Sequence, residues 1–584
     1  MNPTKLIAAL LAGVALTACG SGDINISPST VSTTNNNGGG GGGGGTSTLC
    51  GSRTIGGQTV SGTEDPDGNC LYDSIFVGQN NNLTEDLVLR ALPNGRAHIF
   101  DTSLFVGETY RTQAELAAAG IFEGGDGPTL TVEAGATVAF TDQQFFLIIN
   151  RGSQIIANGT PDAPITFTSL TDVNGTVGPE DVQQWGGIVI NGFSISNKCE
   201  YTDVPRYADG PTDRDSGTNP ALALVTGTEC SVEAEGSAGD DESQYGGVNN
   251  EDDSGSLRYF IVKHTGAEVG NGDELNGISF GGVGRGTLID NLQIYSTFDD
   301  GIEFFGGSVD VNNFVGLYSR DDTIDIDEGY DGTITNALVI QQEQDGNHCI
   351  EADGIGSYDD FDDPAELQSI VDRGLNSRPT INNLTCIVSP NGRPFTHDPG
   401  AGWRLREGII PVIQNALLIS SFGINDDENP DDNYCLRFED DETIAAAAAG
   451  EMQINSAIVA CQEVDRGTTI GAFASEQAWM ESLSSQFATV PVGTAIDASD
   501  AADTDLQLLT GPQKVFSTTW ANAIVDGAMP EMRTTPTDLD GPGDDTDPAP
   551  TFLGATDGTD DWTAPWSFGI NPDNRAQPLW FEGT

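Results

Sequence analysis

The feature that most limits the fold of this chain is a repeat of short β-type segments within residues 277–345. Each repeat alternates apolar and polar residues and ends in an acidic turn. The closing residues Asp300, Asp322 and Asp345 are 22 and 23 residues apart (322−300 and 345−322). This period is too short for a solenoid of helix pairs and fits one coil of a parallel β-solenoid, whose coils stack at roughly 4.8 Å. The repeat therefore predicts an all-β fold, a parallel β-helix in which equivalent acids lie above one another.

The apolar positions of the repeats fix an alignment of three strands. It sets Ile302-Glu303-Phe304 beside Ile324-Asp325-Ile326 and Ile350-Glu351-Ala352. Side chains two residues apart point to the same face of a strand. Two outward columns are therefore predicted next to the corner aspartates: Glu303, Asp325 and Glu351 in the first, and Phe305, Asp327 and Asp353 in the second.

Three interpretations of these acids remain open. The first is a solvated acidic face with turn aspartates that accept hydrogen bonds from nearby backbone N–H groups. The second is a calcium site, because hard cations take several carboxylate and carbonyl oxygens. The ligands predicted for that site are Asp300, Asp322, Asp325, Asp327, Asp345, Glu351 and Asp353.

The third interpretation is acid–base catalysis on a polysaccharide by carboxylates of adjacent coils. Its candidate residues are Asp299, Asp300, Glu303 and Asp322. Pectin-active β-helix enzymes place paired aspartates on one face of adjacent coils, and the Asp299-Asp300-Gly301 run resembles part of such a motif. The chain lacks their Gly-His-Gly and Asn-Thr-Asp motifs and a cluster of basic residues. Arg320 is the closest candidate base, and His348 is interpreted as a residue at the edge of the core.

The N-terminus has the features of a bacterial lipoprotein signal peptide. Lys5 supplies positive charge, an apolar run follows to Leu16, and Leu16-Thr17-Ala18-Cys19 forms the cleavage box. A membrane span needs about 20 apolar residues. We expect residues 1–19 to comprise the signal and the lipidated Cys19; the alternative is an ordinary secretory peptide with an incidental cysteine.

Residues 20–49 are rich in Ser, Thr, Asn and Gly, a composition that cannot bury a core. We expect them to form a disordered tether between the lipid anchor and a body that begins near Cys50. Together with the signal, the tether predicts a protein held at the outer membrane or cell surface, with the anchor as its only contact with the membrane.

The formal charge of −65 arises from 88 acidic against 23 basic residues. Phosphate binding needs clustered Lys and Arg, so this balance excludes nucleic acid as a partner. It also argues against docking onto an anionic membrane surface. Solubility in a salty medium and binding of divalent cations both explain it.

Eight cysteines follow Cys19, and an even number in an exported chain favours disulfides. Spacing alone does not fix their connectivity. As a hypothesis we pair sequence neighbours: Cys50 with Cys70, Cys199 with Cys230, Cys349 with Cys386, and Cys435 with Cys461.

Strand-like runs and turn residues divide the body into three parts. They are an N-terminal cap region at 50–129, the β-helix at 130–470, and a C-terminal capping region at 471–584. Loop insertions are expected at 197–250 and 353–378. Short helices at 445–449 and 476–487 are expected to cover the last coil, whose edge is otherwise open. Trp562 and Trp566 are expected to fix the C-terminal segment to the coils.

Several motifs together resemble one group of proteins. They are PITFT (164–168), WGGIVING (185–192), NGISFGGVG (276–284), DDGIEFFGG (299–307), DEGY (327–330) and WTAPW (562–566). The chain is similar to Gram-negative surface lipoproteins and secreted proteins with a right-handed parallel β-helix. The resemblance implies fold and location more than activity.

These observations predict a lipid-anchored surface protein that binds a ligand or polysaccharide, or acts in adhesion, through an acidic face for which Ca²⁺ is the candidate cation. A polysaccharide and an outer-membrane transporter are the expected partners, the latter by analogy with other surface lipoproteins. The alternative is a polysaccharide hydrolase or lyase that uses the stacked carboxylates.

Overall fold

The structure is a computed structural model. It describes residues 49–78, 80–211, 213–234, 243–269, 274–358, 361, 364–389, 401–420, 434–460, 464–483, 487–490, 517–519, 552–556 and 561–580. Residues 48–584 form one compact unit, to which the following description applies. Cys19 and nearly all of the predicted tether lie outside the described residues. None of the helices in the described ranges has the length and apolar character needed to span a bilayer.

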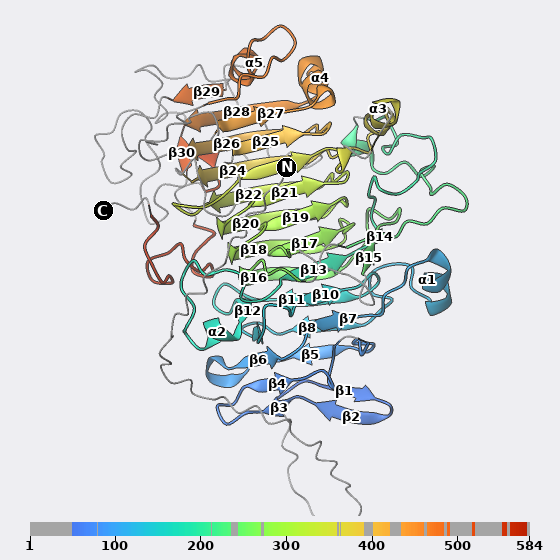
Figure 1. Ribbon diagram of the computed structural model, residues 1–584, viewed down its shortest axis with the longest axis vertical. Helices are drawn as coiled ribbons and strands as arrows, with labels where there is room; N and C mark the ends of the chain where they lie inside the picture. The colour runs from blue at the N-terminus through green and yellow to red at the C-terminus, as the bar shows by residue number, and fades with distance from the viewer. Residues whose placement is uncertain are drawn as a thin grey trace, which may run out of the picture. The chain divides into compact units, whose positions relative to one another are not determined.

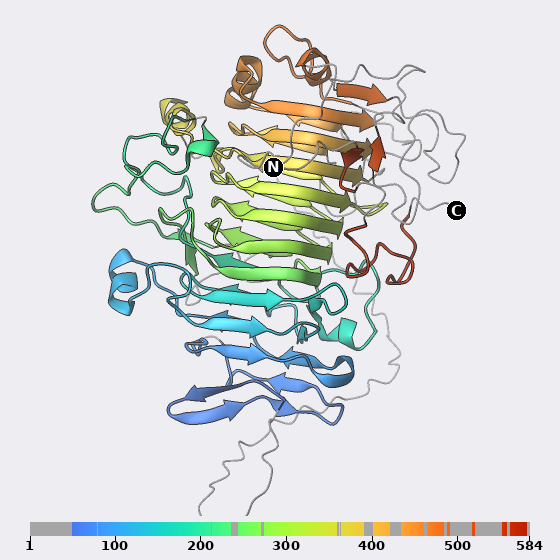
Figure 2. The same ribbon diagram turned by 180° about the vertical axis from the view of Figure 1, so that it is seen from behind.

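Two long sheets of stacked strands make up most of this unit (Figures 1 and 2). All strands of the smaller sheet pair in parallel, coil upon coil. In spatial order, this nine-stranded sheet consists of β27 (Tyr434–Phe438), β25 (Ala401–Arg406), β23 (Ile350–Asp353), β21 (Ile324–Asp327), β19 (Ile302–Phe305), β17 (Ile278–Gly281), β13 (Ile188–Asn191), β10 (Leu147–Ile149) and β7 (Leu104–Val106).

The larger sheet has sixteen strands in the described ranges and contains longer ones. Its main path is β29 (Phe487–Val490), β28 (Gln453–Ala460), β26 (Val412–Ser420), β24 (Thr380–Val388), β22 (Thr333–Ile340), β20 (Asp310–Ser319), β18 (Leu288–Thr297), β16 (Gly255–Thr265), β12 (Ile165–Ser169), β9 (Thr137–Phe140), β6 (Ala97–Phe100), β4 (Cys70–Tyr72) and β3 (Thr63–Glu64). The strands β11 (Gln154–Asn158), β8 (Thr129–Val132) and β5 (Leu87–Leu89) lie off this path. The prediction of a parallel β-helix is confirmed.

Each long strand covers two faces of a coil, because it bends in the middle. The first half of β16 pairs with β11 and its second half with β12, and Tyr259 between the halves has a φ of 45°. The next coils place asparagine at this bend, a residue that tolerates positive φ better than most. Amide side chains join the coils in a ladder, with Asn336 donating to Asn313 at 2.9 Å and Asn383 donating to Asn336 at 2.8 Å.

The interior of the coils is filled by apolar and aromatic side chains that stack from one coil to the next. Phe280 lies on Phe304, and Phe304 on Tyr330, with ring centroids 5.3 and 4.2 Å apart. Inward positions of both sheets belong to one continuous cluster of buried residues. This shared core keeps the strands in register and thereby fixes the outward positions.

Three of the four predicted disulfides are present: Cys50–Cys70, Cys199–Cys230 and Cys349–Cys386. Cys435 is also disulfide-bonded. Its predicted partner, Cys461, lies outside the described residues.

The excursions from the stack leave the C-terminal ends of strands in the nine-stranded sheet, and Figure 1 shows them gathered on one side. The segment after β13 carries the Cys199–Cys230 bridge and the pair β14 (Val232–Glu233) and β15 (Gln244–Tyr245). The segment after β23 carries α3 (Pro364–Asp372). Both were predicted as insertions. A third, after β7, carries α1 (Gln113–Ala119).

Parallel stacking begins before residue 130. Cys70 already pairs with His98 between β4 and β6, and β6 pairs in parallel with β9. Residues expected to form a separate N-terminal cap thus include strands of the parallel stack, β4 to β7. The antiparallel hairpin of β1 (Ser52–Ile55) and β2 (Gln58–Ser61) precedes them.

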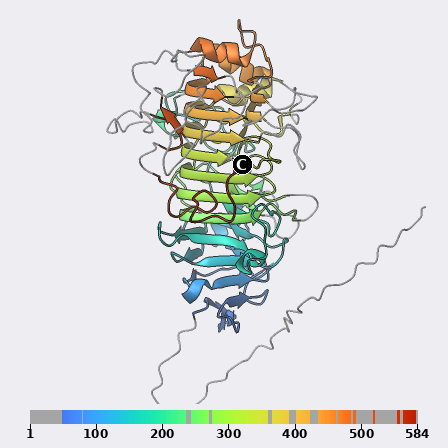
Figure 3. The same ribbon diagram turned by 90° about the vertical axis from the view of Figure 1, so that its left-hand side faces the viewer.

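The C-terminal region does not act only as a cap. At the end of the stack, α4 (Asp441–Ala449) follows β27, and α5 (Glu476–Leu483) contacts β27 and β29, as expected of short helices there. The last described segment, 561–580, instead lies along the side of the sixteen-stranded sheet (Figure 3). Trp566 is buried there in an apolar cluster with Leu317 and Ile340, which confirms its predicted role in fixing this segment to the coils.

Candidate functional site

The predicted acid columns lie on the nine-stranded sheet in the predicted register. Glu303 pairs with Asp325, and Asp325 with Glu351, along β19, β21 and β23. Phe305 pairs with Asp327 in the second column. Apolar residues on either side of each acid point into the core, so the alternation directs the acids outward.

A ladder of polar side chains stands at the corner where these strands begin. Oδ1 of Asn276 accepts the backbone N–H of Asp300 at 3.1 Å, and Oδ1 of Asp300 accepts that of Asp322 at 2.9 Å. Oδ1 of Asp322 in turn accepts the N–H of His348 at 2.6 Å. The last coil step spans 26 residues, against 22 for the step before it.

The prediction that Asp345 occupies the third corner is therefore wrong, and His348 stands there. Asp345 lies in the preceding turn, 3.9 Å from Nε of Arg320. The interpretation of His348 as a residue at the edge of the core also understated its role, because its Nδ1 lies 2.7 Å from Asp322.

The corner aspartates accept backbone N–H groups, as the first interpretation expected, but most of the acids are buried instead of solvated, and Asp325 and Asp327 are half-buried. The exposed fraction is 7% for Asp300 and Glu303, 4% for Asp322, and 6% for Glu351 and Asp353. Buried carboxylates cost free energy unless a cation, a proton or a hydrogen bond compensates their charge. The arrangement therefore requires such compensation.

Three groups of carboxylate and imidazole ligand atoms lie close enough together to share one ion. In each group the ligand atoms lie within 4.8 Å of one another. The groups are Asp300, Glu303 and Asp325; Asp299, Asp300 and Asp321; and Asp322, His348 and Glu351.

Proton affinity is high at the acid-rich coils. Burial and the neighbouring Asp299, Asp325 and Asp322 raise the pKa of Asp300 well above its usual value. Burial and the Glu351 carboxylate do the same to the pKa of Asp322. The pKa of Asp325 is likewise raised by burial and by Glu351. These carboxyls hold protons readily, and a divalent cation would replace those protons.

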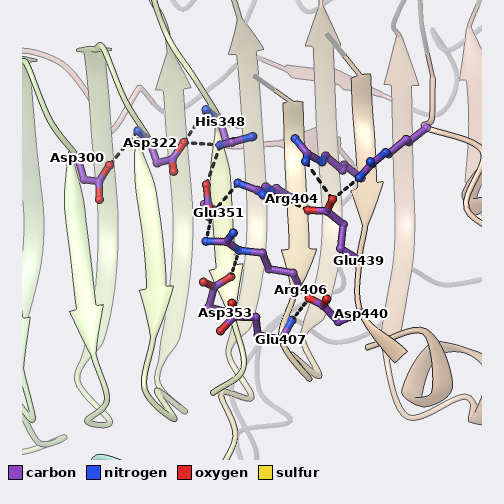
Figure 4. A network of polar contacts seen from close by, with 12 residues as sticks. Asp300, Asp322, His348, Glu351, Asp353, Arg404, Arg406, Glu407, Glu439 and Asp440 are labelled. Atoms are coloured by element: carbon purple, nitrogen blue, oxygen red, sulfur yellow. Dashed lines mark hydrogen bonds and ion pairs between the residues drawn. The ribbon is translucent and has the colours of Figure 1, made fainter. Parts of the chain in front are cut away.

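Two arginines follow the acids in the same columns, at the next coil. Arg404 pairs in register with Glu351, and Arg406 with Asp353. Arg404 Nη1 lies 3.0 Å from Glu351 Oε1, which also contacts Arg406, and Arg406 donates to Asp353 (Figure 4). Arg404 also binds Glu439 with its Nε at 2.9 Å.

Side-chain charge thus changes from negative to positive along the columns, and the acids near the arginines differ in their pKa. The pKa is lowered for Glu351 and Glu439 and raised for Asp353. Burial raises the pKa of Glu351, but the hydrogen bond and charge of His348, together with Arg406, outweigh burial and hold it well below its usual value. For Glu439 the arginines, Arg404 foremost, outweigh burial and lower the pKa to about 2. At Asp353 burial outweighs Arg406, and the pKa rises to about 7.

The remaining predicted site residues lie apart from the three groups. Asp327 lies beside Asp353, and burial and that neighbouring carboxylate raise its pKa well above the usual value. Asp327, Asp345 and Asp353 belong to none of the three groups. The four candidates for catalysis are spread over all three groups, so no single group unites Asp299, Asp300, Glu303 and Asp322.

Sequence reasoning missed Arg404 and Arg406, although a signal was present. Trp403-Arg404-Leu405-Arg406 has the same apolar–polar alternation as Ile350-Glu351-Ala352-Asp353. Extending the alignment by one coil places the arginines in the acid columns. The expectation that the site lacks a basic cluster is corrected accordingly.

The donor set of Asp300, Glu303 and Asp325 fits a hard divalent cation. It consists only of carboxylate oxygens, which hard cations prefer, from two adjacent coils: Asp300 before β19, Glu303 on β19 and Asp325 on β21. These three residues are the ones that could hold such a cation. Asp322, Glu351 and His348 form a different set because they include a nitrogen donor.

The fold and the site define a parallel β-helix with buried ionic columns on one sheet. A model of the family described as "Pectate-lyase like beta helix domain" matches residues 101–503, which is more than half of the chain. The chain belongs to this family, whose fold is one of carbohydrate-active proteins. No match was found among curated proteins or among solved structures.

Proposed function

We propose that the protein is a lipid-anchored β-helix of the outer membrane or cell surface that binds polysaccharide through calcium on its nine-stranded sheet. The observation that carries the proposal is the group formed by Asp300, Glu303 and Asp325. Two of its members are less than one-tenth exposed. Burial, and after it the nearby carboxylates, raise the pKa of Asp300 and Asp325, as expected where a cation is to be held.

The neighbouring arginines support an anionic or polar carbohydrate as the ligand. Arg404 and Arg406 keep 20% and 28% of their side chains exposed while they bind Glu351. Guanidinium groups recognise carboxylates in a bidentate manner. A cation on the acid-rich coils and arginines on the adjacent coil would together bind an acidic polymer that runs along the stack.

The surface location follows from the signal and the tether in the sequence, and an outer-membrane transporter is the proposed recipient of the bound ligand. The test of location is metabolic labelling of Cys19 with a lipid precursor, followed by protease treatment of intact cells. A Cys19→Ser variant should lose the label and leave the membrane fraction. Label that persists in this variant would contradict the proposal.

Calcium binding is tested on chelator-treated protein by calorimetric titration and thermal unfolding. Calcium should raise the melting temperature of the wild type, and Asp300→Asn/Asp325→Asn should weaken binding about tenfold or more, because two charged ligands are lost. Asp290→Asn is the matched control, since Asp290 lies on β18 of the other sheet, 3.2 Å from Arg258. Absence of any calcium effect on the wild type would reject the calcium site.

Carbohydrate binding is tested by affinity electrophoresis against acidic and neutral polysaccharides, with calcium and with chelator. Retardation by acidic polymers that requires calcium supports the proposal, whereas no retardation across the panel contradicts it. Arg404→Gln should weaken retardation without abolishing calcium binding.

A second candidate is cleavage of the polysaccharide, favoured by the contact of His348 with Asp322 at 2.7 Å. A histidine oriented by a carboxylate is a common arrangement for proton transfer. Incubation with the same panel should then release reducing ends or unsaturated products, and His348→Gln should abolish the release. Binding without product formation would leave binding as the function.

A further inference from the structure

His348 is held unlike a purely structural histidine. Its Nδ1 lies 2.7 Å from Oδ1 of Asp322 and 3.0 Å from Oε2 of Glu351. Its buried Nε2 makes no hydrogen bond within the described part of the chain. His98 is equally buried, yet both of its ring nitrogens have partners, the hydroxyl of Tyr72 at 2.8 Å and a backbone carbonyl at 2.7 Å.

Two carboxyl oxygens thus converge on one ring nitrogen. A single N–H can point at only one acceptor, so the other oxygen faces a lone pair or shares the proton poorly. A cation among the three atoms would accept one lone pair from each of them at once, while Oδ1 of Asp322 keeps the N–H of His348. We propose that Asp322, His348 and Glu351 bind a divalent transition-metal ion of the Zn²⁺ class.

The donor set decides between metals. Imidazole nitrogen suits zinc, cobalt, nickel and copper, whereas calcium takes oxygen ligands. With metal–ligand distances of about 2.0 Å in a tetrahedral site, neighbouring ligand atoms lie about 3.3 Å apart. The two contacts of Nδ1 would then have to widen by about 0.3–0.6 Å, which side-chain rotation supplies.

The surroundings already orient these ligands. Oε1 of Glu351 is held by Arg404 and Arg406, so Oε2 is turned toward His348. The backbone of His348 is fixed by its own N–H bond to Asp322 and by the adjacent disulfide of Cys349. Partners of this kind orient ligands in metal sites and strengthen binding.

This site shares no residue with the calcium group of Asp300, Glu303 and Asp325, so the inference does not rest on the proposed function. Both groups lie on the same sheet, on neighbouring coils. The two sites differ in their donor atoms and hence in the ion that each selects.

The test uses the full chain, purified without a histidine tag and stripped of metal with a chelator. Titration with Co²⁺ should produce visible absorption bands of a low-symmetry cobalt site that saturate near one equivalent, and Zn²⁺ should remove them by competition. His348→Gln should lose the bands. His264→Gln is the matched control and should keep the bands. Its Nε2 also lies near a carboxylate, 3.8 Å from Asp172, but among the described residues the two belong to no group of three metal-ligand side chains.

Two further variants keep the outcome decisive. Asp322→Asn retains the oxygen that accepts the N–H of His348, so it should fold and bind Co²⁺ about tenfold or more weakly. Asp300→Asn/Asp325→Asn should lose the calcium effect and keep the cobalt bands. Absence of bands in the wild type, or unchanged bands in both His348→Gln and Asp322→Asn, would overturn the inference. In that case the three side chains only share protons in hydrogen bonds that join neighbouring coils.

Discussion

The two sheets share one coil geometry, but over the coils of β19 to β25 they bury their outward faces in opposite ways; nearer the N-terminus, outward residues of the nine-stranded sheet such as Ile148 and Val189 are apolar as well. On the sixteen-stranded sheet, outward residues such as Leu317 and Ile340 are apolar and lie under Trp566 and Leu553 of the C-terminal region. On the nine-stranded sheet, outward residues such as Asp325 and Glu351 are acids, compensated in part by arginines of the next coil.

The difference shows what each face can do. Covering an apolar face with a segment of the same chain lowers the free energy of the folded state. Burying carboxylates raises the free energy of the folded state unless a cation, a proton or an arginine compensates their charge. The first face therefore serves stability, and the second is available for binding. Four changes test this contrast, in order of expected effect.

Trp566→Ala should have the largest effect. The side chain is 1% exposed and its indole Nε1 donates to the carbonyl of Trp562 at 2.7 Å. Removing it should lower the free energy of unfolding by about 3–5 kcal/mol. Chemical denaturation measures the loss, and proteolysis should cut the released C-terminal segment. Unchanged stability and protease resistance would mean that this segment does not depend on the sixteen-stranded sheet.

Arg406→Gln should have the second largest effect and lower the free energy of unfolding by about 2–4 kcal/mol. It leaves Glu351 and Asp353 without the arginine that they share. The loss is reduced by the 28% exposure of the arginine side chain. In Arg406→Gln/Asp353→Asn, part of the stability should return, which denaturation at neutral pH would detect. Additive losses in the double variant would contradict coupling of the pair.

Asp300→Asn should stabilise the metal-free protein at pH 8 by about 1–3 kcal/mol, since it removes the cost of keeping an ionisable carboxyl buried but keeps the oxygen that accepts the N–H of Asp322. Folding raises the pKa of Asp300, so the unfolded chain loses this proton first. Stability therefore falls as pH rises from the ordinary value of 3.8 to the raised value, and stays low above it.

Melting curves between pH 4 and pH 8 measure this dependence, to which Asp353, with its pKa of about 7, contributes in the same direction. Asp300→Asn should flatten the profile. Glu133→Gln is the control, because Glu133 is 47% exposed in a 3.8 Å pair with Arg90 and should change stability by less than about 0.5 kcal/mol. A profile that is equally steep in Asp300→Asn would show that the charge of the whole chain, and not this site, sets the pH dependence.

Asn336→Ala should have the smallest effect of the four and lower the free energy of unfolding by about 1–2 kcal/mol. It removes the bonds to Asn313 and Asn383 and places alanine at a φ of 58°. Denaturation should show the loss with the calcium affinity unchanged, because the ladder lies on the sixteen-stranded sheet. A change in calcium affinity would show that the two faces are coupled through the core.

The register of the acid columns could be predicted because the apolar residues between them must face the core. Ile302, Ile324 and Ile350 align in the sequence as they do in the structure. The corner could not be predicted, because the turn before β23 is longer than in the preceding coil and moves His348 into the place expected for Asp345. A turn can absorb extra residues without changing the strands, so equal spacing along the chain does not guarantee equal positions in the stack.

The position of the C-terminal segment could not be predicted from the sequence either. Its tryptophans indicate a packed segment, but an apolar residue carries no information on which apolar face it covers. The choice between the end of the stack and the side of the sixteen-stranded sheet depended on the outward apolar residues of several coils together. These, including Val315, Leu338 and Leu417, are ordinary strand residues in the sequence.

By itself the sequence determined the parallel β-helix and the outward direction of the acids, because alternation and coil period are local properties of the chain. The disulfide pairs stayed a hypothesis at that point, and it took the structure to show three of them. Only the tertiary structure decided that these acids are buried, that His348 bridges Asp322 and Glu351, and that arginines complete the columns. Burial and ion pairing depend on neighbours from other coils, and stacking alone brings those neighbours together.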